Sequence, residues 1–249
     1  MIIKKNITTI MFFVLGFVFF SCRREDKINV LKDYFSNGKI ESEYQYIIKN
    51  GDTILDGKYV SYYENGAKKT EGQYVNNHLK GKFITYFENG NIKISDYVLN
   101  SKVNLESIWN YSNGRIERYV LMDDYGSANF IVKFDKEGIV KSSQGMPIFE
   151  FYHFKEKNKK ELKIGDVLAY KYMVANIPNA KRKFTINLEN FDNKQIVRKI
   201  VTKEPTIIEV EETVVKKGHN IIRAKVEIEF NDKFKTIIKD SISFDFFVK

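Results

Sequence analysis

The chain repeats a short motif, and this repeat limits the possible folds more than any other feature. An aromatic pair with Asn-Gly close behind occurs in residues 62–66 and again in residues 86–90, and a weaker copy spans residues 110–114. The glycines at 66, 90 and 114 are evenly spaced, and Gly138 continues the series. An earlier copy in residues 34–38 has a slightly longer spacing. A fixed period in the twenties indicates a stacked array with one supersecondary unit per repeat.

Each unit has the pattern of two strands joined by tight turns. In residues 81–87, Phe83 and Thr85 alternate with Ile84 and Tyr86, so that the two sets point to opposite faces of a strand. Asn-Gly then follows, and both residue types tolerate the positive φ of a hairpin turn. A second strand and a second turn complete the unit and leave no room for a helix. The sequence therefore predicts a β-hairpin in every repeat.

The positions that recur can be read from the best copy of the motif. In residues 57–74 they are Gly57, Tyr59, Tyr62, Tyr63, Asn65, Gly66, Gly72 and Tyr74. This pattern resembles the MORN-type repeat, in its bacterial, antitoxin-like variant. The resemblance extends over about residues 30–142, with degenerate third and fourth units. It implies a scaffold or binding surface without shared catalytic residues, and the antitoxin label implies a bound partner.

Residues 1–21 have the pattern of a secretion signal. Lys4 and Lys5 precede an apolar run in residues 7–20, which is shorter than the roughly 20 residues of a membrane span. The run ends at Ser21-Cys22, which resembles a lipobox, and Cys22 is the only cysteine. We therefore expect a lipoprotein that begins at Cys22. The alternatives are a secreted protein without lipid and an uncleaved anchor.

A charged tether, residues 22–30, follows the predicted lipidation site. Its acidic pair Glu25-Asp26 resembles the segments that direct some Gram-negative lipoproteins to the outer face of the membrane. Acylation at several positions anchors a protein stably, whereas one chain alone is marginal. The predicted location is the bacterial cell envelope, in the outer membrane, on its periplasmic or surface face.

The second half of the chain has a different pattern. The repeat stops after Gly138, and the predicted boundary separates an array in residues 31–145 from a domain in residues 146–249. Short runs of alternating apolar and polar residues follow, and about seven such strands in about 100 residues are typical of a β-sandwich. Residues 217–220 resemble a corner of Ig-like domains. The predicted fold class is all-β, an array of stacked β-hairpins followed by an Ig-like β-sandwich that folds alone.

The excess positive charge lies in the second half. Residues 22–145 hold 18 basic and 17 acidic side chains, whereas residues 146–249 hold 21 and 15. A basic domain can bind an anionic partner. Here the lysines alternate with apolar residues, as on solvated strand faces, and no nucleic-acid-binding module is recognisable. We therefore predict no nucleic-acid partner.

No pattern indicates a catalytic residue, a cofactor or a metal. The histidines, His78, His153 and His219, lie far apart in the sequence, and no phosphate-binding loop or nucleophile motif is present. The pair Asp123-Asp124 is interpreted as structural, because neighbours on a strand point to opposite faces. The prediction is a protein that is not an enzyme. A hydrolase with an unrecognised site is the alternative.

Three aromatic residues are the candidates for partner binding: Tyr62, Tyr86 and Trp109. Tyr62 and Tyr86 recur in register, and such a column either packs across the strands of a thin sheet or offers a stacking platform. Trp109 breaks the repeat. The predicted function is a cell-envelope lipoprotein that presents a protein- or polysaccharide-binding surface. The alternative is an antitoxin- or immunity-like protein that binds a toxin in the envelope.

Metabolic labelling with a fatty acid tests the predicted membrane anchor. The wild-type protein should incorporate the label and partition into detergent, because acyl chains on Cys22 supply apolar area. Cys22→Ala should do neither. Equal labelling of the two proteins would contradict the prediction.

Overall fold

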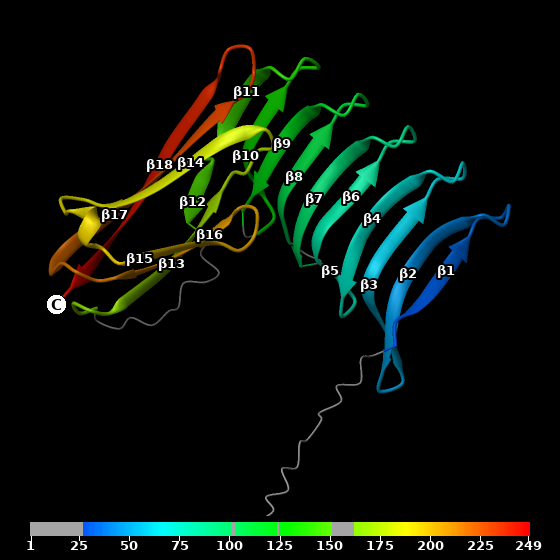
Figure 1. Cartoon of the computed structure of the whole chain (residues 1–249), viewed down its shortest axis with the longest axis horizontal. Helices are drawn as coiled ribbons and strands as arrows, with labels where there is room; N and C mark the ends of the chain where they lie inside the picture. The colour runs from blue at the N-terminus through cyan, green and yellow to red at the C-terminus, as the bar shows by residue number, and fades with distance from the viewer. Residues whose placement is uncertain (1–26, 101–102, 124, 151–161) are drawn as a thin grey trace, which may run out of the picture.

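The computed structural model describes residues 27–100, 103–123, 125–150 and 162–249. Cys22, Glu25, Asp26, Asp124 and His153 lie outside the described residues. Figure 1 shows a long row of strands that leads from the N-terminal end to two smaller sheets. In the described ranges, no helix is long and apolar enough to cross a membrane.

The repeats form one antiparallel sheet, eleven-stranded within the described residues. Its strands are β1 (Asn29–Tyr34), β2 (Ile40–Lys49), β3 (Asp52–Tyr62), β4 (Lys68–Val75), β5 (His78–Leu79), β6 (Gly81–Tyr86), β7 (Ile92–Asn100), β8 (Val103–Asn110), β9 (Ile116–Met122), β10 (Ala128–Phe134) and β11 (Val140–Gly145). Apart from the short β5, which pairs with β4, each strand lies beside its neighbours in sequence. The predicted array of β-hairpins is therefore confirmed.

One turn geometry recurs at the tip of each hairpin. The Tyr63 N–H donates to the Ala67 carbonyl, and the Gly66 N–H donates to the Tyr63 carbonyl, both at 2.8 Å. The same two bonds close residues 35–39, 87–91, 111–115 and 135–139. Gly66 has a φ of 88°, and the strand pairing slips by one residue beside the turn, as in a type I turn with a G1 bulge.

The expectation of positive φ at both Asn and Gly holds only for the glycine in these turns. The φ of Asn65 is not positive. Its side-chain Oδ1 accepts a hydrogen bond from the Ala67 N–H at 2.8 Å. The asparagine therefore stabilises the turn through its side chain. At the opposite end of the strands, Asn50 and Gly51 both have positive φ, 54° and 91°.

Two smaller antiparallel sheets follow the array. Sheet B has the order β12-β13-β16-β15 and sheet C the order β14-β17-β18. Their strands are β12 (Ile148–Glu150), β13 (Val167–Val174), β14 (Ala180–Leu188), β15 (Arg198–Thr202), β16 (Ile207–Thr213), β17 (Gly218–Phe230) and β18 (Ile237–Val248), with a 3-10 helix η2 (Asn193–Gln195). Aromatic rings join the sheets: Tyr172 lies 5.7 Å from Phe184 and Tyr170 lies 5.1 Å from Phe244, between ring centroids. We call these two sheets the sandwich.

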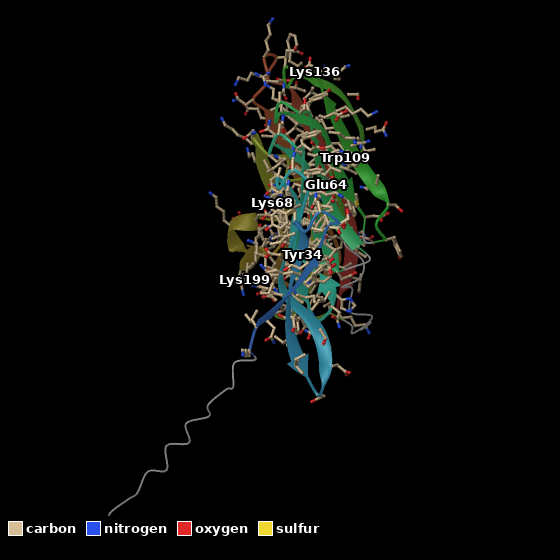
Figure 2. The ribbon with its side chains drawn as sticks, turned by 90° about the vertical axis from the view of Figure 1, so that its right-hand side faces the viewer. Tyr34, Glu64, Lys68, Trp109, Lys136 and Lys199 are labelled. Carbon is tan, nitrogen blue, oxygen red and sulfur yellow. The ribbon has the colours of Figure 1, made fainter. Side chains whose placement is uncertain are left out.

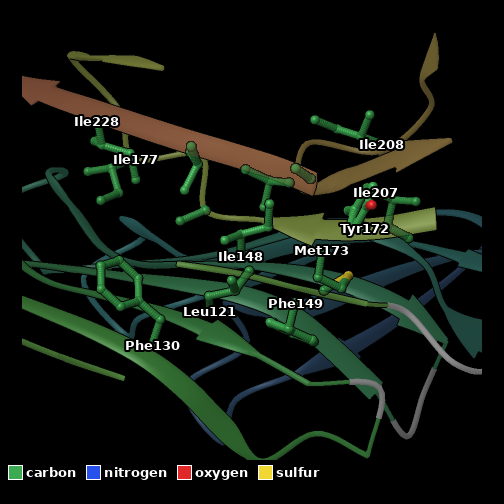
Figure 3. Close-up of a cluster of buried hydrophobic side chains, with 14 of the residues drawn as sticks. Leu121, Phe130, Ile148, Phe149, Tyr172, Met173, Ile177, Ile207, Ile208 and Ile228 are labelled. Carbon is green, nitrogen blue, oxygen red and sulfur yellow. The ribbon is translucent and has the colours of Figure 1, made fainter. Parts of the chain in front are cut away.

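One cluster of buried side chains continues from the array into the sandwich. Figure 3 shows Leu121 and Phe130 of the array beside Ile148 of β12, and all three are almost completely buried. The ring of Phe134 in β10 lies 5.7 Å from the ring of Phe230 at the end of β17. We call this cluster the shared core. The predicted domain boundary falls between β11 and β12, but apolar contacts cross it.

Hydrogen exchange on Leu121→Ala tests how strongly the shared core couples the two parts. Loss of this fully buried side chain should lower the free energy of unfolding by about 2–5 kcal/mol. Amide exchange should become faster in both β8–β10 and the sandwich. Val60 is buried in β3 but lies outside the shared core, so Val60→Ala should affect the array alone. If Leu121→Ala also affects the array alone, the sandwich folds independently, as the sequence predicts.

Candidate binding surface

Strand pairing divides the side chains of the array between two faces. One row of cross-strand neighbours consists of Glu43, Val60, Glu71, Ile84, Ser95, Ile108, Tyr119 and Val132. Tyr119 and Val132 belong to the shared core, so this row marks the sandwich-side face. The adjacent row lies on the far face and consists of Ser42, Ser61, Thr70, Thr85, Ile94, Trp109 and Arg118.

Tyr62, the first predicted binding residue, lies on the sandwich-side face. Its hydroxyl donates to Glu43 Oε2 at 3.1 Å, and Lys32 Nζ lies 2.7 Å from Glu43 Oε1. The hydrogen bond from Lys32 lowers the pKa of Glu43. Burial raises the pKa of Tyr62, and the bond to Glu43 adds to this effect. The phenol is therefore held as a donor to an ionised carboxylate.

Tyr86 repeats this arrangement in the next unit. Its hydroxyl donates to Glu71 Oε1, and Lys68 Nζ lies 2.8 Å from Glu71 Oε2. Burial and the bond to Glu71 raise the pKa of Tyr86 to about 12, while the bond from Lys68 lowers the pKa of Glu71. Lys68 Nζ also lies 5.4 Å from the centre of the Tyr86 ring. The cation therefore covers part of one ring face.

Trp109, the third predicted binding residue, lies on the far face. The guanidinium carbon of Arg118 is 4.4 Å from the centre of its ring, which is cation–π geometry. Figure 2 looks along the array and shows Lys68 on the side where the sandwich lies and Trp109 on the other. The structure thus brings Tyr62 and Tyr86 together on one face and leaves Trp109 apart from them.

A column of stacked rings covers part of the far face, and the sequence analysis did not single it out. The ring of Tyr59 lies 4.8 Å from that of Tyr44 and 6.3 Å from that of Phe83. Gly72 makes room for this column, because a Cβ there would lie 2.5 Å from Phe83 Cδ2. The alternation in residues 57–63 and 81–87 places Tyr59 and Phe83 on the same face, and this pattern could have predicted the column. These rings turn their faces to each other, which leaves those faces unavailable to a sugar.

Side chains at the turns bind the next repeat, and the sequence analysis also missed this contact. The Tyr63 hydroxyl donates to the Tyr86 carbonyl at 2.7 Å, and the Tyr111 hydroxyl donates to the Phe134 carbonyl at 2.9 Å. Both bonds span 23 residues, almost one repeat. These tyrosines therefore fix the stacking of one hairpin on the next and are engaged within the protein.

A buried polar cluster lies where the array meets the sandwich. The Tyr119 hydroxyl donates to Glu106 Oε2 and accepts a hydrogen bond from the Asn176 N–H, both at 2.9 Å. Only 6% of the surface of Glu106 is exposed. Burial raises the pKa of Glu106 to about 7, although the Tyr119 hydrogen bond and the charge of Arg182 act in the opposite direction.

The remaining polar candidates have structural roles or form no metal site. Within the described ranges, no group of three or more His, Cys, Asp or Glu side chains could hold a metal ion. Asp123 lies in a turn, where its Oδ1 accepts hydrogen bonds from the N–H groups of Tyr125 and Ser127. His219 Nε2 lies 3.0 Å from Asp245 Oδ2 in an exposed pair.

Comparison with known proteins identifies the repeats. The MORN repeat variant matches residues 29–47, 55–76 and 79–100. Residues 29–100 therefore carry MORN-type repeats, as the resemblance implied. No curated protein matches the chain. The hairpins beyond residue 100 lie outside the matched segments but keep the same turn geometry.

The stability of the protein should depend on pH through Glu106. Because its folded-state pKa is about 7 and its ordinary value 4.5, the folded protein holds a proton that the unfolded chain releases. As the pH rises from about 4.5 to about 7, the free energy of unfolding should therefore fall, and the contribution of this group is on the order of 3 kcal/mol. Glu106→Gln keeps an acceptor for Tyr119 and removes the titration. Urea unfolding of both proteins at several pH values measures the difference, and identical pH profiles would contradict it.

Proposed function

We propose that the chain is a non-enzymatic lipoprotein of the bacterial cell envelope, anchored through Cys22, whose repeat array binds a partner protein. The observation that carries this proposal is the free part of the sandwich-side face. The array side chains that pack in or against the shared core come from β7–β11, and Tyr97 of β7 donates a hydrogen bond to Glu204 before β16. Strands β2–β6 contribute no side chain to that core.

The free part of the sandwich-side face has the chemistry of a protein-binding surface. It presents two half-buried tyrosines, each with a Glu–Lys pair, at a fixed repeat spacing. Lys58 and Lys82 extend the same face and are exposed. Tyrosines with a polar surround are common at protein interfaces. A polysaccharide would stack on free ring faces, whereas Lys68 covers part of one face of Tyr86.

The sandwich is proposed to be Ig-like. Its strand orders β12-β13-β16-β15 and β14-β17-β18 correspond to the orders A-B-E-D and C-F-G of constant-type immunoglobulin domains. Residues 146–249 contain no cysteine, so such a domain has no disulfide. This analogy concerns the fold and assigns no function by itself.

Co-purification from detergent-solubilised envelopes tests the proposed function. The wild-type protein should recover a specific partner protein. The double variant Lys58→Glu/Lys82→Glu should reduce its recovery about tenfold or more, because the new glutamates would repel the acidic groups that complement the lysines on the partner. Lys183→Glu/Lys225→Glu changes the charge equally on the exposed side of sheet C and should retain the partner. Loss of the partner only in the second variant would place the binding surface on the sandwich. Recovery of no specific protein by wild type would contradict the proposal.

A further inference from the structure

The first strand of the array is a sheet edge with exposed apolar side chains. Within the described residues β1 pairs with β2 alone, so its outer backbone N–H and C=O groups have no strand beside them. Val30, Leu31 and Tyr34 are 51%, 49% and 58% exposed. Such an edge is a template for pairing with a strand of another chain.

The usual protection of an edge strand is weak in β1. Lys32 is its only lysine, and its Nζ lies 2.7 Å from Glu43 Oε1 on β2, so its charge is drawn toward the sheet. The strand contains no proline, and its one register slip lies at the last step, between Asp33 and Tyr34. Bulges, prolines and outward lysines are the devices that normally prevent edge pairing.

Among the described residues, β1 is the one strand of its type without a neighbour on its outer side. Tyr34 occupies the repeat position of Tyr62 and Tyr86, whose hydroxyls donate to a glutamate on the preceding strand. The equivalent strands β3, β6, β8 and β10 are paired on both sides. Only β1, among the described strands of this type, lacks the preceding neighbour.

The strand at the other end of the array, β11, differs from β1 in chemistry. The residues of β11 after Val140 are polar or glycine and are exposed. The sandwich packs on the neighbouring strands, and the Val140 N–H donates to Asp232 Oδ2, in the turn between β17 and β18, at 3.4 Å. Among the described residues β11 is thus also an edge strand, but its exposed side chains are polar, whereas those of β1 include Val30, Leu31 and Tyr34.

We propose that β1 pairs with β1 of a second copy of this chain, so that two arrays form one continuous antiparallel sheet. A two-fold axis perpendicular to the sheet keeps corresponding faces together, so only residues on the same face can oppose each other. With Leu31 on the axis, Leu31 opposes Leu31, Val30 opposes Lys32, and Asn29 opposes Asp33.

This register is complementary in charge and in polarity. The Asn29 amide can donate to the Asp33 carboxylate, and the aliphatic part of Lys32 covers Val30. No like charges oppose each other. A register centred on Lys32 would oppose two ammonium groups, which is unfavourable. The interface consists of one strand pair, so we expect a small contact area and a weak dimer.

Single-cysteine cross-linking tests the proposed dimer. Cys22 is the only cysteine, so a Cys22→Ser background gives each variant one thiol. On mild oxidation of the purified full-length chain, Leu31→Cys should form a disulfide-linked dimer, because opposed residues have Cα atoms about 4.5–5.5 Å apart. Lys32→Cys alone should remain monomeric, since its symmetry mate is displaced along the strand. A mixture of Val30→Cys and Lys32→Cys should form a mixed dimer.

Sedimentation of the Cys22→Ser chain provides a readout without cross-linking. Its sedimentation coefficient should rise with concentration, and Leu31→Lys should abolish the rise by placing two ammonium groups at the axis. Ser143→Lys on the opposite edge is the matched control and should behave like the parent chain. A circular dichroism melt checks that each variant is folded.

Three results would overturn the proposal. A monomeric Leu31→Cys under oxidation, together with a concentration-independent sedimentation coefficient, would exclude the pairing of β1 with itself. Cross-linking of Lys32→Cys as efficient as that of Leu31→Cys would exclude the symmetric register. A mixed dimer of Leu31→Cys with Ser143→Cys would show head-to-tail pairing of β1 with β11 in its place.

Discussion

Pairing between neighbouring strands is the interaction on which the rest of this structure depends. A single-layer sheet has no second layer against which to bury its side chains, so each hairpin must find its contacts on the adjacent hairpins. The far face meets this requirement with rings that stack across strands, from Tyr44 to Tyr59 and Phe83. The sandwich-side face meets it with tyrosine–carboxylate bonds. The turns add tyrosine hydroxyls that bind the next repeat.

One position of the repeat shows how the array changes from a free surface into a docking surface. Tyr62 and Tyr86 are half-buried and hydrogen-bonded within the array, Asn110 follows them, and Phe134 occupies the same position in the last unit. Phe134 is buried against Phe230 of the sandwich. At this position the phenol of the free repeats is thus replaced by an aromatic hydrocarbon in the last unit, which packs under the sandwich.

The sequence predicted those parts of the structure that local chemistry determines. Asn-Gly and the 24-residue spacing located the hairpins, and alternation located the strands of the sandwich. The shared core was not predicted, because alternation assigns residues to two faces without saying which face another layer covers. Glu71, Ser95 and Tyr119 occupy one repeat position. The change along the array from a charged residue to a buried aromatic one is the sequence feature that could have indicated where another layer covers the sheet. Trp109 occupies the repeat position of Ser61 and Thr85, one residue before the position of Tyr62 and Tyr86, so the spacing and the alternation together already placed it on the opposite face.

The same constraint gives the two ends of the array different requirements. In a stack of repeats each terminal unit has a neighbour on one side only, so its outer edge must be suited either to solvent or to another chain. At the C-terminal end, the sandwich packs on one face of the last hairpins, and the edge strand β11 presents polar side chains to solvent. At the N-terminal end the chain offers β1, an apolar strand in the register of the repeat, and the described residues supply no cover. The two edges therefore differ in polarity: the apolar edge at β1 is the one suited to a second copy, and the sandwich-side face of β2–β6 remains for a partner protein.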